Sequence, residues 1–190
     1  MAENTYYTVL TQTGMDKIAA ANAGGDPVEL TTIHAGDGGD ETYYDTYDQP
    51  ALVALLDLVS EVWSAQLNDL ATDPDNPNWV VAEGVIPADT GGWMVREVGI
   101  KDTAGDLIAV GRFPPTYKPS LNDGAAQDLL LRTIMEVSNA ESVTLQVDPG
   151  VALASQGFVE ERIDREDRET GQKWRLIYVD GYIATEEVGA

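Results

Sequence analysis

The stretch from Asn78 to Pro119 constrains the fold more than any other part of the sequence, because it holds three apolar runs separated by turn-forming residues. The runs are Trp79–Ile86, Trp93–Ile100 and Leu107–Phe113. Runs of aromatic and β-branched residues bounded by glycine, proline and aspartate are typical of strands joined by turns. Residues 101–106, between the second and third runs, form a connection whose length suits an antiparallel hairpin. We therefore predict a compact antiparallel sheet in the middle of the chain, with the other elements packed around it.

Two helices and a strand are predicted before this sheet. Apolar residues at helical spacing predict a helix over Gly14–Ala23, with Thr13 as a candidate N-cap. The same spacing predicts an amphipathic helix over Pro50–Trp63, and Asp48 is its candidate N-cap. Between them, the alternation in Pro27–Ala35 predicts a strand. The fold class that follows is α+β, with a mostly antiparallel sheet core and two helices.

The segments that flank the central sheet are less sharply defined. Ser64–Thr72 either continues the second helix or forms a short strand. The proline-rich residues 114–119 are typical of a rigid, extended connector. After it, Leu129–Val137 and Val143–Val147 are apolar and predict two further strands.

Two domains are expected, 5–155 and 156–190, because the composition changes character after residue 155. In the second part, Trp174–Asp180 and Tyr182–Thr185 predict a hairpin around Asp180-Gly181. Thirty-five residues build little core alone. We therefore expect this β extension to pack on the main domain or to exchange strands with a neighbouring subunit.

Charge is the strongest fact in the composition. Asp plus Glu number 33 against 11 Lys plus Arg, which gives a net charge of −22, while 43% of the residues are hydrophobic. A folded core is therefore expected, and nucleic acid, which is bound through cationic side chains, is excluded as a partner. The acidity indicates either an ordinary soluble acidic protein or adaptation to high salt, where screening removes self-repulsion. The chain has no cysteine and no apolar run long enough for a membrane span, and its first residues do not resemble a secretory signal.

Candidate catalytic and metal-binding patterns are weak. His34 is the only histidine and follows an apolar strand, so a structural role is predicted for it. A cation loop from Asp37, Asp40 and Glu41 is an alternative to a glycine turn, but the spacing is not that of an EF-hand. The hexapeptide 73–78 has acids but also two prolines, which favours a plain loop. With no nucleophile elbow, phosphate loop or zinc ligand set, we predict no enzyme activity, cofactor or metal.

Two groups of side chains have candidate roles in contacts. The tyrosines of the segment 43–47 either pack this segment onto a core or subunit, or bind a sugar. Glu83, Glu97 and Asp102 lie in or beside the central strands, where their expected use is a salt link to another strand or another subunit. Arg96 points to the opposite face from its neighbour Glu97 on a strand, so these two do not pair.

Residues 73–119, which contain IPADTGGWMVREVGIKD followed by GDLIAV and PPTYKP, closely resemble the phage tail-collar fibre protein family. Residues 6–38 resemble the opening of that domain, and residues 129–155 resemble its end. The resemblance thus covers residues 5–155. It implies a virion part that is made in the host cytoplasm, lies at the baseplate-proximal end of a tail fibre, and is trimeric. The family domain usually precedes a long shaft, whereas this sequence ends at Ala190, so the expectation is a short collar or adaptor.

The resemblance implies assembly as the function. Expected partners are baseplate wedge proteins, a distal tail-fibre protein and two further copies of the chain. Aromatic and proline residues are the candidates for protein contact, with the core as the alternative place for each tryptophan. They are Trp79, Trp93, Pro114, Pro115, Tyr117 and Trp174. A carbohydrate-binding receptor module is the alternative function, and an acidic surface suggests a saline host such as a haloarchaeon or a marine bacterium.

Overall fold

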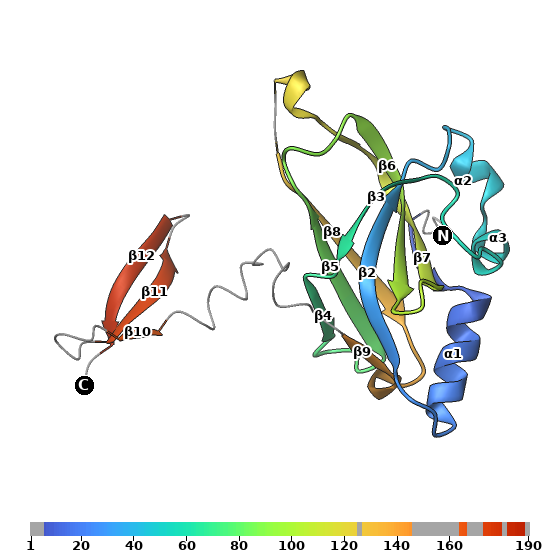
Figure 1. Ribbon diagram of the computed structural model, residues 1–190, viewed down its shortest axis with the longest axis horizontal. Helices are drawn as coiled ribbons and strands as arrows, with labels where there is room; N and C mark the ends of the chain where they lie inside the picture. The colour runs from blue at the N-terminus through green and yellow to red at the C-terminus, as the bar shows by residue number, and fades with distance from the viewer. Residues whose placement is uncertain (1–5, 125–126, 146–163, 167–172, 180–181, 189–190) are drawn as a thin grey trace. The chain divides into compact units, whose positions relative to one another are not determined.

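A computed structural model describes residues 6–124, 127–145, 164–166, 173–179 and 182–188 (Figure 1). The chain divides into two compact units, Met1–Ala152 and Leu153–Ala190. In its described part, the first unit consists of two facing sheets and a layer of short helices. The second consists of a small antiparallel sheet. The described residues are thus mostly β-sheet with short helices, an arrangement compatible with the expected α+β class.

The larger sheet of the first unit has the strand order β1-β7-β6-β2-β3, and β9 pairs with β2 in parallel. All its other pairs are antiparallel. The strands are β1 (Thr8–Leu10), β2 (Val28–Gly36), β3 (Glu61–Gln66), β6 (Trp93–Asp102), β7 (Leu107–Lys118) and β9 (Val143–Leu145).

The smaller sheet has the order β4-β5-β8 and is antiparallel throughout. Its strands are β4 (Asp69–Thr72), β5 (Trp79–Ile86) and β8 (Leu129–Glu136). The prediction of one central sheet was therefore wrong for its first run, because β5 pairs with β4 and β8 and not with β6. The hairpin of β6 and β7 is confirmed, and the Asp102 carboxylate accepts the Ala104 and Asp106 N–H groups in its turn.

The proline-rich segment 114–119 is mostly strand and not a free connector. Tyr117 and Thr116 pair with Met94 and Val95 of β6. The register shifts between Val95 and Glu97, so that extra residues of β7 bulge out there. Because Pro114 and Pro115 lie in this bulge, their missing N–H groups leave no gap in the ladder.

Two hydrophobic clusters stabilise the unit. The main core lies between the sheets and joins side chains such as Leu30 of β2, Ile108 of β7 and Leu131 of β8. A second cluster lies on the other face of the larger sheet, where Leu52 and Leu58 pack with Leu107 and Val110. Residues 43–60 therefore cover this face of the larger sheet, while the outer face of the smaller sheet carries no helix in the described residues (Figure 1).

The first helix, α1 (Gln12–Asn22), begins two residues before the predicted Gly14. Its N-cap is Thr11 and not Thr13, because the Thr11 hydroxyl accepts the Gly14 N–H at 3.0 Å. The Thr11 hydroxyl also donates to the Leu107 carbonyl, so the same residue ties the helix to β7.

The predicted helix over Pro50–Trp63 is wrong beyond its first turn. The chain instead forms α2 (Tyr43–Thr46), α3 (Gln49–Val53), an irregular segment and then β3. Asp48 caps α3 as expected, by accepting the Ala51 N–H. The strand alternative for Ser64–Thr72 is confirmed in part, because the chain leaves β3, passes the buried Leu67 and enters β4.

The remaining elements follow the apolar runs. Leu129–Val137 forms β8, and Val143–Val147 contributes β9, of which residues 146–147 lie outside the described part. These two strands do not pair with each other, since β8 pairs with β5 and β9 with β2. Two single-turn helices, η1 (Leu121–Asp123) and η2 (Ala140–Ser142), lie before β8 and β9.

The second unit has three described strands, and they pair antiparallel in sequence order. They are β10 (Asp164–Glu166), β11 (Lys173–Val179) and β12 (Tyr182–Val188). The predicted turn at Asp180-Gly181 lies outside the described residues.

Candidate assembly surface

The outer face of β8 carries apolar side chains where a solvated strand normally carries polar ones. Inward-facing residues such as Leu131 and Met135 are fully buried in the main core. The outward positions alternate with them and are Leu130, Arg132, Ile134 and Glu136. Leu130 is 52% exposed and Ile134 is 41% exposed. We name these four outward residues, together with Trp79, the β8 face.

Trp79 extends this surface onto the neighbouring strand. It begins β5, lies opposite Glu136 in the register and is 37% exposed. Ile134 lies opposite Val81, and Leu130 lies opposite Val85, so the apolar positions continue across the two strands. Antiparallel sheets with one solvated face usually show polar residues at such positions. The face thus has the composition of a covered surface.

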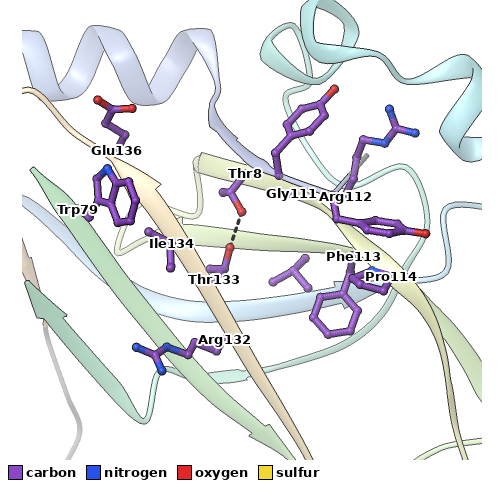
Figure 2. Close-up of a pocket in the computed structure, with 13 residues that line it drawn as sticks. Thr8, Trp79, Gly111, Arg112, Phe113, Pro114, Arg132, Thr133, Ile134 and Glu136 are labelled. Carbon is purple, nitrogen blue, oxygen red and sulfur yellow. Dashed lines mark hydrogen bonds between the residues drawn. The ribbon is translucent and has the colours of Figure 1, made fainter. Parts of the chain in front are cut away.

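An open groove of about 530 Å³ runs beside β8, between it and the strands β1 and β7 (Figure 2). The side chains of Trp79, Ile134, Phe113 and Pro114 line it. At its floor, the Thr8 and Thr133 hydroxyls form a hydrogen bond of 2.5 Å that ties β1 to β8. The groove is therefore continuous with the β8 face.

The charge on this surface is unusual for so acidic a chain. Arg132 lies between the exposed Leu130 and Ile134, and its side chain is 57% exposed. The other Lys and Arg side chains of residues 6–145 are buried or half-buried. Most of them are held by internal partners, such as Asp102 for Lys17 and the Asp37 carbonyl for Arg96. The contact of Arg132 with Glu83 is long, at 3.5 Å.

The structure brings only some of the predicted contact residues together. Trp79 and Pro114 line the groove. Pro115 and Tyr117 are exposed further along β7, and the Tyr117 hydroxyl donates to Asp123 at 3.0 Å. Trp93 is half-buried and packs on the main core. Trp174 lies in β11 of the second unit, and its side chain lies outside the described residues.

The tyrosines of the segment 43–47 pack inward. Tyr43 is buried, belongs to the second cluster and stacks on Tyr47 with the ring centroids 5.3 Å apart. The Tyr44 hydroxyl donates to the Phe113 carbonyl at 2.6 Å, and Arg112 lies over the Tyr44 ring. Burial raises the pKa of Tyr44 to about 12, so its hydroxyl remains a donor at neutral pH. These contacts anchor the segment to β7 and leave little ring surface for a sugar.

The acidic loops use their carboxylates to hold the backbone. Asp37 accepts the Gly39 N–H, and Asp73 accepts the N–H groups of Asp75 and Asn76. Gly38 and Gly39 have positive φ in the first loop, as a tight glycine turn requires. Within the described residues, no three histidine, aspartate or glutamate side chains gather closely enough to hold a metal ion.

His34 and the carboxylates in the central strands form hydrogen bonds or salt bridges with other residues of the same unit. His34 is buried, its Nε2 lies 2.9 Å from the Thr32 hydroxyl, and burial lowers its pKa. The predicted salt link to another strand is confirmed for Glu83, with Arg132 of β8, whereas Asp102 pairs with Lys17 of the helix α1. The prediction is wrong for Glu97, whose carboxylate accepts backbone N–H groups instead.

Leu130, Arg132 and Ile134 were not among the predicted contact residues. The run LLLRTIME has apolar residues on both faces of a strand, and this was the signal available in the sequence. Its meaning depends on what covers the second face, which the sequence does not give.

For the described residues there is no helix long and apolar enough to cross a membrane.

Comparisons with known proteins agree with the predicted resemblance. The family described as phage tail-collar fibre protein, N-terminal, matches residues 1–157. A probable tail fiber protein of Escherichia phage P2 is 38% identical over 159 residues, which are 83% of this chain and 23% of that protein. The chain thus spans about a quarter of the length of this curated relative. No solved structure matches the chain.

These matches define the chain as a structural component of a virion tail. It belongs to the phage tail-collar fibre protein family, whose N-terminal domain accounts for residues 1–157.

Proposed function

We propose that this chain attaches or adapts a tail fibre to the baseplate of a tailed virus. The observation that carries the proposal is the match of residues 1–157 to the N-terminal domain of a tail-collar fibre family. The similarity to a tail fiber protein of phage P2 supports the same role. The mechanism is assembly through protein contacts, and the role requires no catalytic step.

The proposed partners are baseplate wedge proteins, a distal tail-fibre protein and two more copies of this chain in a homotrimer. An exposed apolar strand face beside an open groove supports a role in assembly, because monomeric proteins rarely leave such surfaces uncovered. The inward packing of Tyr43 and Tyr44 gives the sugar-binding alternative no support.

Immunogold electron microscopy of virions of the phage that encodes this chain tests the attachment role. We expect an antibody against this chain to label the tail at the baseplate, where the fibres begin. The antibody absorbed beforehand with the purified chain is the control and should give no label. Label on the capsid, on the distal part of the fibres, or on no part of intact virions would overturn the proposal.

We also propose that the net charge of −22 is an adaptation to a saline environment, such as that of an archaeal or marine host. Self-repulsion should be strong at low salt, because the Debye length falls from about 30 Å at 0.01 M to about 3 Å at 1 M. We therefore expect the unfolding temperature to rise between these two NaCl concentrations. Sucrose, which stabilises proteins without screening charge, is the control. An unfolding temperature that is the same at both NaCl concentrations would contradict this proposal.

A further inference from the structure

We propose that the β8 face and the groove beside it form the surface through which copies of this chain associate. This inference rests on the homotrimer in the proposed function and assigns the contact to particular residues. Its occupant is a second copy of the chain. The groove and the face form one surface, because Trp79, Arg132, Ile134 and Glu136 belong to both.

The apolar composition of the face is the first argument. β8 is an edge strand, whose only strand partner in the described residues is β5. Edge strands usually carry charges or prolines that prevent association, but two of the four outward positions of β8 are exposed Leu130 and Ile134. The second cluster shows that the opposite side of the unit is already covered by α3 and the segment 54–60. Of the two outer sides of this sandwich, the smaller sheet's side thus has the uncovered apolar strand.

Charge complementarity is the second argument, and it fits a second copy of the chain as the partner. Arg132, in the centre of the face, is the one exposed Lys or Arg side chain among residues 6–145. Its long contact with Glu83 leaves donors of the guanidinium available for another carboxylate. A second copy supplies carboxylates in excess, because the chain has 33 acidic residues against 11 basic ones. Copies repel one another over most of their surface. The β8 face, where Arg132 offsets the charge of Glu136 and the other residues are apolar, is where they repel least.

The geometry of the groove decides how the neighbour binds. The hydrogen bond between Thr8 and Thr133 ties the middle of the β8 edge to β1, so a second copy cannot pair with that edge as one continuous strand. The contact therefore uses side chains on the face and in the groove. Three partly exposed apolar residues supply only part of the roughly 800 Å² that each partner buries in a stable interface. Phe113 and Pro114, on the far wall of the groove, must contribute to the same contact.

The mass in solution, measured by light scattering at several protein concentrations, tests this inference. We expect the wild type to have three times the mass of the 20.5 kDa chain, that of a homotrimer. The double variant Leu130→Thr with Ile134→Thr should be monomeric, because it removes the apolar contact while threonine retains a preference for strands. Leu56→Thr is the matched control, since Leu56 is 79% exposed but lies far along the chain from β8, next to the helices. This variant should keep the wild-type mass.

The variant Arg132→Glu distinguishes association that depends on charge complementarity from non-specific hydrophobic association. It should weaken association at least tenfold at low salt and less at high salt, where ion pairs are screened. Because Arg132 is exposed, this variant should keep the far-UV circular dichroism spectrum of the wild type, which shows that the fold is intact. A monomeric wild type at both salt concentrations would overturn the inference, as would β8-face variants that keep the wild-type mass. In either case label at the baseplate would still support the attachment role, so the two proposals fail separately.

Discussion

Replacing Glu97 by alanine is expected to lower the free energy of unfolding by about 3 kcal/mol. Glu97 is fully buried in β6, and its two carboxylate oxygens accept the N–H groups of Ser60 at 2.8 Å and Val59 at 3.1 Å. Without the carboxylate these partly buried donors lose their partner, and an unsatisfied buried donor costs about 1–3 kcal/mol. Removing a buried charge offsets part of that cost. Urea unfolding followed by tryptophan fluorescence measures the change.

Glu29→Ala is the matched control for this variant. Glu29 also lies in a strand of the larger sheet, β2, but its side chain is exposed. The free energy of unfolding should change by less than about 0.5 kcal/mol, as is usual for surface substitutions. Equal effects of the two alanine variants would show that Glu97 does not organise the segment before β3.

The pH dependence of the Glu97 contribution has a definite sign. Burial raises the pKa of Glu97 above its ordinary value of 4.5, although the hydrogen bonds from Ser60 and Val59 act in the other direction. The folded protein therefore holds this proton more tightly than the unfolded chain. The stability from this difference is fully present below pH 4.5 and is lost as the pH rises through the raised pKa. The difference in unfolding free energy between the wild type and Glu97→Gln should therefore be larger near pH 4 than near pH 8. The opposite trend would show that the carboxylate is held mainly in its charged form.

Glu97 also explains why the helix predicted over Pro50–Trp63 does not form. Leu52, Leu55, Leu56 and Val59 have helical spacing, but Leu56 is 79% exposed and so is not on a buried face. The N–H groups of Val59 and Ser60 bond to Glu97, which lies 37 or more residues further along the chain. The edge of β2 then takes residues 61–66 as a strand. Local periodicity cannot show competition from such distant partners.

Elements whose stability is local were predictable, and long-range arrangements were not. The runs that form β2, β5, β6 and β8 are apolar and bounded by turn residues, so the sequence itself indicates the strands. The assignment of β5 to a second sheet depends on its pairing with β4, just before it in the chain, and with β8, which follows the central stretch at a distance. The assembly surface likewise could be predicted from the sequence only in part. Trp79 and Pro114 were predicted as contact residues by type, whereas Ile134 is identified only by its exposure beside them.

The acidity of the chain has a structural component as well as an electrostatic one. The carboxylates of Asp37, Asp40 and Asp73 accept loop N–H groups close to them in the sequence. Asp102 does the same in the β6–β7 turn while it binds Lys17. These aspartates would be needed at any salt concentration, because they satisfy backbone donors in turns. Adaptation to high salt can therefore account only for the remaining exposed Asp and Glu residues, which do not hold loop backbone.

Replacing Gly14 by alanine is expected to destabilise the protein by about 3 kcal/mol, although helix propensity alone predicts the opposite. Alanine is favoured over glycine inside a helix by about 1 kcal/mol. Gly14, however, is buried in the first turn of α1, where a Cβ atom would lie 2.1 Å from the carbonyl oxygen of Ile108. That atom belongs to the backbone of β7, so the helix would have to move away from the strand. Overpacking of this kind typically costs 1–3 kcal/mol.

The movement would also break the hydrogen bonds that place the helix. The Thr11 N–H donates to the same Ile108 oxygen at 3.0 Å, and its hydroxyl donates to Leu107. Both bonds require the close approach that Gly14 allows. Ala19→Gly, at an exposed position of the same helix, is the matched control and should cost about 1 kcal/mol from propensity alone. If thermal and urea unfolding showed that Gly14→Ala stabilises the protein, propensity would dominate and the contact of α1 with β7 would be looser than described. A loss larger than that of the control would show that this helix is held by its packing on β7.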